Sequence, residues 1–316
     1  SMSFALENHW VWDHWILRSE DQLDLFYLHA PKSLGNPSLR HVNAAIGHAV
    51  SKDNGKHWEV LPVAVAPRET PDFDDRAIWT GSAIHLPNGG IRLFYTAISQ
   101  GDGGKLVQRI GWADSEDGVT FTRKRSFHDP KNPPLQAVAP WYETQESTDG
   151  DVAWRDPFVF QEDGTWHMIV TATLAREKGE QQVGAIGHLT SADLETWEAH
   201  PPIAHHSRFE EMECAQTRLI DGKNWLVFSC TPIRQNPPTA GFTWIVPGDG
   251  PLGSFDFSQA MYLKKTDIYA YQIFEDVEGK WKITGFHSGD DATFTGTIPE
   301  PLDWSLDEFE LLNLNE

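Results

Sequence analysis

The chain has 316 residues, and its 25 Lys and Arg against 46 Asp and Glu give a formal net charge of −21. So acidic a protein repels phosphate backbones and anionic lipid, which makes nucleic acids and membrane surfaces poor candidate partners. Its two cysteines are too few for a disulfide framework, and neither a zinc-ligand spacing nor an apolar run of membrane-spanning length occurs.

The first three residues, Ser1, Met2 and Ser3, are typical of a cloning remnant that precedes a native start. The segment 4–13 lacks the basic start and the apolar stretch of a signal peptide. We therefore expect a cytoplasmic enzyme, unless a leader was removed. The 14 Trp, 17 Phe, 25 Gly and 20 Pro favour many short strands and turns over long helices.

A motif of the form Ile-Gly-x-x-x-Ser recurs three times along the chain, starting at Ile46, Ile110 and Ile186. Each copy is followed two residues later by an Asp and then by an aromatic residue, which predicts a strand, an Asp-centred turn and a further strand. Five apolar, aromatic segments recur with it, most of them after a Gly-bearing turn. They span residues 23–30, 91–98, 165–174, 225–230 and 281–286.

Five such units in 316 residues give about 63 residues each, enough for a four-stranded sheet with its loops. Radial repetition of four-stranded sheets is the β-propeller architecture. The pattern therefore predicts an all-β, five-bladed β-propeller over residues 1–316, a single catalytic domain with a central-channel active site and no C-terminal β-sandwich domain. A β-sandwich fold for the chain itself remains an alternative.

The first strand of each propeller blade lines the central channel, so the segments about a dozen residues before each apolar segment are candidate site segments. Three of them carry a carboxylate in the same slot: Asp13, Asp156 and Glu213. Burying one carboxylate beside Trp and apolar residues is costly unless the group is paired or used. Three of them in equivalent slots predict a shared catalytic site.

Four motifs follow one another along the chain: Trp12-Asp13-His14-Trp15, Trp79-Thr80-Gly81-Ser82-Ala83, Arg155-Asp156-Pro157 and Glu213-Cys214. In this order they resemble the β-fructosidase superfamily of five-bladed propellers, which joins the levansucrase family to the invertase, inulinase and levanase family. The opening motif is most similar to levansucrases, whereas the last is similar to the acid/base motif of invertases. The mixture indicates a side branch without the β-sandwich domain of invertase-type members.

The resemblance implies a retaining glycoside hydrolase, which uses two carboxyl groups about 5 to 5.5 Å apart. Asp13 would be the nucleophile on the fructosyl anomeric carbon, and Glu213 the acid and then the base. Asp156 would bind ring hydroxyls and stabilise the oxocarbenium-like transition state. Arg155 would neutralise the carboxylates and donate to a sugar hydroxyl.

Further residues are expected around the sugar. Either Tyr269 or Tyr271 should face the site, since strand alternation permits only one. His48 and His188 are expected to be structural, and His205 and His206 to lie in a solvated loop. The expected binding residues are Trp12 and Trp15 as walls, Trp79 as stacking platform, Thr80 or Ser82 as donor, Tyr271, and Arg234 at the leaving-group subsite. Asp53, Asp114, Asp117 and Asp193 fit turns, so neither a metal nor a cofactor is predicted.

We therefore expect a β-fructofuranosidase that acts on sucrose or short fructooligosaccharides, with some fructosyl transfer. Its partner would be a small neutral carbohydrate, and the chain would be a monomer or a homodimer. Two alternatives stay open: an inverting arabinofuranosidase or arabinanase-like propeller, whose carboxylates stand roughly 6.5 to 9.5 Å apart, and a propeller that binds sugar without cleaving it.

Overall fold

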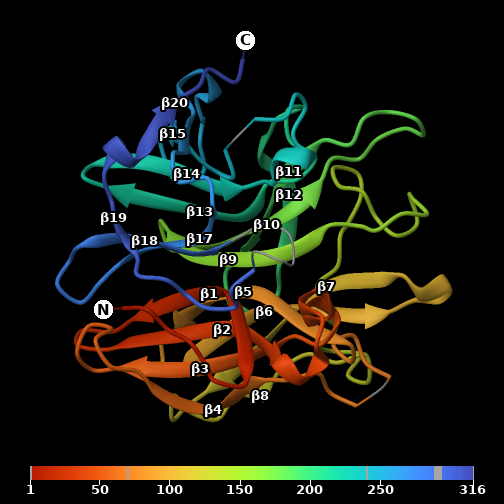
Figure 1. The fold of residues 1–316 in the computed structure, drawn as a ribbon. Helices are drawn as coiled ribbons and strands as arrows, with labels where there is room; N and C mark the ends of the chain where they lie inside the picture. Colours follow the sequence, from red (N-terminus) through yellow and green to blue (C-terminus); the bar gives the residue numbers. More distant parts are fainter. Residues whose placement is uncertain (1, 70, 240, 288–293, 316) are drawn as a thin grey trace. The chain divides into compact units, whose positions relative to one another are not determined.

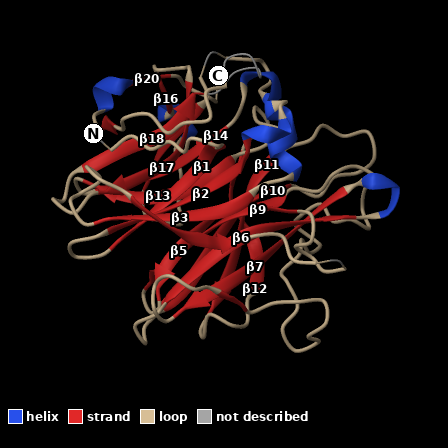
Figure 2. Ribbon diagram, turned by 60° about the horizontal axis from the view of Figure 1, so that its bottom comes forward, coloured by secondary structure: helices blue, strands red, loops and turns tan. Residues whose placement is uncertain are grey.

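The computed structural model describes residues 2–69, 71–239, 241–287 and 294–315. The chain divides into two compact units. The first comprises residues 1–136 and 267–304, and the second residues 137–266 and 305–316. Strands dominate both units, and the helices are short (Figure 2). No helix in the described residues is long and apolar enough to cross a membrane.

The first unit contains three antiparallel sheets, whose strands neighbour one another in chain order (Figure 1). The last of them has three strands in the described residues. The strands are β1 (His9–Arg18), β2 (Leu23–Pro31), β3 (Ala45–Ser51) and β4 (Glu59–Val65); β5 (Ala77–His85), β6 (Ile91–Gln100), β7 (Leu106–Ser115) and β8 (Thr122–Arg123); and β17 (Ile268–Glu275), β18 (Trp281–His287) and β19 (Leu302–Asp303).

The second unit contains two sheets, and the C-terminal strand β20 completes one of them by pairing with β16. The strands are β9 (Trp154–Glu162), β10 (Thr165–Thr173), β11 (Gly184–Ser191) and β12 (Glu198–His205); and β13 (Glu213–Ile220), β14 (Lys223–Ser229), β15 (Thr243–Gly248), β16 (Met261–Leu263) and β20 (Phe309–Leu311). The 3₁₀ helices of the chain are η1 (Lys32–Leu34), η2 (Pro37–Val42), η3 (Asp102–Gly104), η4 (Pro232–Arg234), η5 (Phe257–Gln259) and η6 (Leu306–Glu308).

The repeat predicted from the sequence matches these strands. The five apolar segments form β2, β6, β10, β14 and β18, and the three Ile-Gly motifs form β3, β7 and β11. The predicted Asp turns follow them: the hydroxyls of Ser51, Ser115 and Ser191 donate to Asp53, Asp117 and Asp193. Asp114 is not a turn residue as predicted, because it lies within β7 and pairs with Arg92 at 2.7 Å.

Each unit has its own apolar core. In the first unit, Phe4 bridges Ile298 and packs with Tyr27, so the start of the chain is fixed to a segment almost 300 residues away. In the second unit, Phe209, Phe228 and Trp244 are fully buried and meet edge to face. Burial of such rings supplies a large share of the apolar stabilisation of each unit.

The first strand of every sheet is interrupted by a shift in register, and each shift falls on a candidate site segment. In β1 the shift lies between Val11 and His14, and in β5 between Trp79 and Gly81. Such β-bulges bend a strand, re-aim its side chains and are frequent beside active sites. The other shifts leave Asp156 and Pro157 of β9 unpaired, fall between Glu213 and Gln216 of β13, and fall between Ala270 and Gln272 of β17.

Gly81 shows why the bulge in β5 needs its particular sequence. A Cβ atom at this position would lie 1.8 Å from the carbonyl oxygen of Phe94 and 2.9 Å from the Cα of Tyr95. Only glycine therefore allows the two backbones to approach so closely. The Trp-Thr-Gly-Ser-Ala motif thus places Thr80 at a point where the strand can deviate from regular pairing.

Candidate active site

Asp13 lies in the bulge of β1, and its side chain is held by a neighbouring strand. The residue is only 9% exposed. Thr80 of β5 donates its hydroxyl to the Asp13 carboxylate. Thr96 in turn donates to the backbone oxygen of Thr80 at 2.6 Å. Thr80 thus fixes the orientation of the Asp13 carboxylate, and Thr96 holds the backbone of Thr80 in place.

The His14 side chain stabilises the same bulge with two hydrogen bonds. Its Nδ1 lies 2.6 Å from the backbone oxygen of Trp12, and its Nε2 lies 2.8 Å from the hydroxyl of Thr284. Burial lowers the pKa of His14 to about 4, although the Trp12 bond opposes the shift. The ring is therefore neutral at pH 7, with Nδ1–H donating to Trp12 and Nε2 accepting from Thr284.

Two of the predicted aromatic residues are organised by helix η2. The indole Nε1 of the half-buried Trp79 donates to the backbone oxygen of His41 at 2.7 Å. The guanidinium of Arg40 lies 5.6 Å from the ring centroid of Trp12, a cation–π contact. Trp12 and Trp15 are both 3% exposed, and Trp15 is stacked on Phe26, so it contributes to the packing of the sheet.

The remaining predicted binding residues of the first unit are Ser82, Tyr269 and Tyr271, and the structure describes the side chains of the first two. Ser82 is 7% exposed, and its hydroxyl oxygen has no hydrogen-bond partner among the described residues. Tyr269 is buried against Phe286. The side chain of Tyr271 lies outside the described part of the structure, so its prediction stays a prediction.

In the second unit, Asp156 occupies the bulge of β9 and is 5% exposed. Its Oδ2 accepts from the Thr171 hydroxyl at 2.7 Å and from the backbone amide of Cys214 at 3.0 Å. Burial raises the pKa of Asp156, while Arg155, Thr171 and Cys214 oppose that shift. Asp156 and Cys214 have φ values of 61° and 55°, which non-glycine residues rarely adopt.

Arg155 connects the carboxylates of this unit. Its Nη2 donates to Glu211 at 2.7 Å and to Glu213 at 3.3 Å, and its Nε lies 3.8 Å from Asp156. Burial opposes the charge of Arg155, but Glu213, Glu211 and Asp156 together hold its pKa above the ordinary value. The sequence had placed Glu211 near Glu213 without showing that it shares Arg155 with the predicted acid.

Arg234 lies on helix η4, half exposed, with its Nη1 3.5 Å from Glu210. The loop is anchored by the buried Gln235, whose amide nitrogen donates to the backbone oxygens of Cys230 and Gly241. Arg234 is therefore presented to solvent on a fixed loop. Gln235 is a positioning feature that the sequence pattern did not single out, because a lone glutamine carries no motif.

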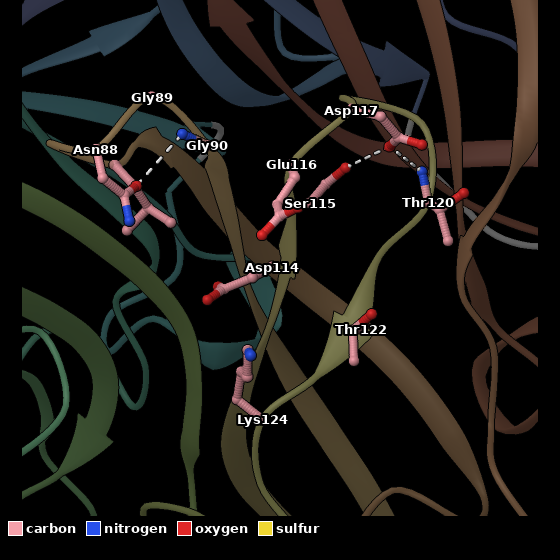
Figure 3. A pocket seen from close by; sticks show the side chains of 11 residues that line it. Asn88, Gly89, Gly90, Asp114, Ser115, Glu116, Asp117, Thr120, Thr122 and Lys124 are labelled. Atoms are coloured by element: carbon pink, nitrogen blue, oxygen red, sulfur yellow. Dashed lines mark hydrogen bonds between the residues drawn. The ribbon is translucent and has the colours of Figure 1, made fainter.

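A cavity of about 710 Å³ lies elsewhere in the first unit (Figure 3). Asp114 is already paired with Arg92, and Asp117 accepts from Ser115 and from its own turn. No aromatic ring lines it to stack on a sugar, so it is not the candidate site. The cavity is lined by Leu86, Asn88–Gly90, Asp114–Asp117, Thr120, Thr122 and Lys124.

Among the described residues, no cluster of His, Cys, Asp or Glu could hold a metal ion.

The sequence of residues 13–299 matches the family model described as the glycosyl hydrolases family 32 N-terminal domain. The chain belongs to this family. It is 26% identical over 285 residues to the sucrose-6-phosphate hydrolase of Escherichia coli, a match that covers 84% of this chain and 52% of that protein. The chain thus spans about half the length, or less, of the first curated relatives that it matches.

Solved structures agree with the family 32 assignment at the level of the fold. The inulosucrase from Halalkalicoccus jeotgali bound to kestose has a TM-score of 0.72 and 21% identity over 98% of this chain and 88% of that one. The catalytic domain of Microbacterium saccharophilum K-1 β-fructofuranosidase has a TM-score of 0.69 and 20% identity over 93% of this chain and 78% of that one. With the five sheets, this likeness confirms the predicted five-bladed β-propeller.

Proposed function

We propose that this family 32 protein is a retaining β-fructofuranosidase that cleaves terminal fructosyl linkages of sucrose or short fructooligosaccharides. The observation that carries the proposal is common to the three carboxylates. Each lies in or beside a β-bulge in the first strand of its sheet, and each is held by a hydroxyl, amide or guanidinium donor. The E. coli relative named above is a sucrose-6-phosphate hydrolase, which supports a sucrose-type substrate.

In the proposed first step, a carboxylate oxygen of Asp13 bonds to the anomeric C2 of the fructosyl unit. The bond from C2 to the leaving-group oxygen breaks, and that oxygen takes the proton of Glu213. In the second step, ionised Glu213 removes a proton from water, whose oxygen attacks C2 and displaces Asp13. Two inversions at C2 give net retention, and a sugar in place of water would give fructosyl transfer.

The supporting residues have distinct proposed tasks. The Thr80 hydroxyl is engaged with Asp13, so its task is to orient the nucleophile. Asp156 accepts hydrogen bonds from ring hydroxyls and stabilises positive charge at C2, while Arg155 balances the carboxylates. Ser82, with its unpartnered hydroxyl, donates to the sugar, and Trp79 stacks on it. Trp12 and Arg234 belong to the walls of the sugar and leaving-group subsites.

The test is a substrate panel with product analysis. Sucrose, its phosphorylated form, kestose-type oligosaccharides and an aryl arabinofuranoside are each incubated with the enzyme, and the first product is followed by NMR. We expect fructose released from sucrose with its β-configuration retained. Asp13→Asn should lower kcat by several orders of magnitude, whereas Asp53→Asn, which alters an Asp of a surface turn, should not.

Three outcomes would contradict the proposal in different ways. Net inversion would favour the arabinanase-like mechanism, and full activity of Asp13→Asn would remove the assigned nucleophile. Sugar binding without turnover would favour the non-catalytic propeller. We also propose that the 316 residues act as one catalytic domain in the cytoplasm, and sedimentation would decide between monomer and homodimer.

A further inference from the structure

The carboxylate of Asp156 accepts hydrogen bonds from two strands other than its own. The hydroxyl of Thr171 on β10 donates to Oδ2 at 2.7 Å, and the amide of Cys214 on β13 donates to the same oxygen at 3.0 Å. Thr171 is fully buried, and its hydroxyl also lies 3.4 Å from the backbone oxygen of Met212. The side chain of Thr171 on β10 thus contacts both β9 and the segment that leads to Glu213.

Regular strand pairing does not hold the backbone of Asp156 in place. The β9–β10 register passes from Phe158 directly to Arg155, so Asp156 is outside the ladder, and Pro157 has no N–H to donate. The φ of 61° at Asp156 is an unfavourable conformation for a residue with a Cβ. The surrounding contacts must therefore maintain the conformation.

We propose that Thr171 is a positioning residue of the fructosidase reaction, whose hydroxyl orients the Asp156 carboxylate while it couples β9 to the segment bearing Glu213. The inference rests on the proposed function of Asp156. It concerns a residue that no catalytic motif of the sequence contains, because threonine in a strand is common and its partner lies on another strand.

The groups around Asp156 determine in which direction its pKa should change when the Thr171 hydroxyl is removed. Arg155 of β9 faces it, and Glu211, Glu213 and Cys214 of the neighbouring segment surround that arginine. Burial raises the pKa of Asp156, and the Thr171 hydroxyl is one of the groups that lower it. Removing this hydroxyl should raise the pKa further, so the acid limb of the pH profile should move to higher pH.

The decisive comparison is Thr171→Val with Thr171→Ser. Valine removes the hydroxyl at nearly constant volume, so kcat/KM for sucrose should fall about 10- to 100-fold. The acid limb of the kcat/KM profile should rise by about 1 pH unit. Serine restores the donor and should return both quantities towards the wild-type values. Thr173→Val removes a buried hydroxyl two residues along β10 and should leave the acid limb in place.

Several results would overturn the inference. A folded Thr171→Val enzyme with the wild-type acid limb would do so, and so would a serine variant that shifts the limb as far as valine does. If Thr171→Val does not fold by circular dichroism, Thr171→Cys, a much weaker donor, must show the displaced limb when folded. A wild-type enzyme that releases no fructose from any sugar contradicts the proposed function; an active wild type with unshifted variants contradicts only the role of Thr171.

Discussion

Arg155 divides its hydrogen bonds unequally between two carboxylates. Its Nη2 is 2.7 Å from Glu211, whereas the Nη2 and Nε contacts with Glu213 are 3.3 and 3.4 Å. The guanidinium thus contacts both carboxylates, with its shortest bond to Glu211. A general acid must keep its proton until the leaving group takes it, and an arginine shared with Glu211 favours ionised Glu213 less than an arginine paired with Glu213 alone.

Glu211→Gln should therefore change the pH profile rather than only the rate. Without the Glu211 charge, Arg155 is no longer shared and its interaction with Glu213 becomes stronger, and a repelling negative charge disappears. Both changes favour ionised Glu213, so the alkaline limb of the kcat profile for sucrose should move to lower pH. Glu210→Gln is the matched control, because Glu210 pairs with the half-exposed Arg234 instead. Equal profiles for Glu211→Gln and wild type would contradict this account.

The predictability of single residues depended on whether their signal was local. Asp13, Asp156 and Glu213 could be selected because each sits in a recurring slot flanked by distinctive neighbours. The role of His14 could not, because its Nε2 partner Thr284 lies 270 positions away. Thr171 was missed for the same reason: its bond to Asp156 crosses between strands and leaves no local pattern.

A row of imidazoles crosses three strands of the second unit. Nδ1 of His167 on β10 lies 2.9 Å from Nε2 of His188 on β11, and the ring of His200 on β12 lies 5.3 Å from that of His188. The bond between two imidazoles needs a donor and a bare acceptor nitrogen, so both rings cannot be protonated at once. Burial, with His167 and His200 adding to it, lowers the pKa of His188 to about 4.

This row predicts acid sensitivity of the β9–β12 sheet. Unfolded His188 would titrate near pH 6.5 but the folded residue near 4, so between these values the unfolded chain binds the extra proton. The contribution of His188 to stability is complete above pH 6.5 and is lost as the pH falls towards 4. His188→Gln should flatten the dependence of Tm on pH in this window.

Thermal unfolding followed by circular dichroism from pH 7.5 to 4.5 would measure the effect. His205→Gln provides the control, because His205 lies on the same sheet but is exposed. If both variants had the same Tm slope as the wild type, the row of imidazoles would have no part in acid unfolding.

At the level of elements, repetition made the second and third strands of most sheets predictable. The terminal strands were not, and β20 shows why. Its three residues pair with β16, from which they are separated by about 48 positions, and both strands are short. Short runs of this kind have no periodicity to detect, and the pairing is decided by tertiary contacts.

The net charge of −21 acts on the molecule as a whole. Even if every Lys and Arg neutralised one acid, 21 carboxylates would remain to repel one another. Raising NaCl from about 10 to 200 mM shortens the screening length from about 30 to below 10 Å. We expect Tm at pH 7.5 to rise by about 2 °C or more, since relief of self-repulsion favours the compact state.

Differential scanning calorimetry in NaCl, KCl and choline chloride would check this expectation. General screening should act equally in the three salts, whereas an effect confined to one cation would indicate a specific site. A Tm that falls with salt would mean that attractive ion pairs, such as Arg92 with Asp114, outweigh the excess negative charge.

The whole fold could be predicted because its repeats are visible, but its division into units could not. The motifs mark where sheets begin, and they do so in both units alike. Which sheets pack into one compact unit depends on side chains at their surfaces, such as Phe209, Phe228 and Trp244, whose contacts span many residues. A repeat unit of the sequence is therefore not the same as a unit of packing.

The positive φ angles of Asp156 and Cys214 have a consequence for descent within the family. Glycine adopts that conformation without the Cβ penalty, so stability alone would favour glycine at both positions. We expect the task of Asp156 in catalysis to outweigh this penalty. In propellers of this family that have lost catalysis, glycine should therefore become frequent at these two positions, so the pair would be a marker of lost activity that can be read from sequence alone.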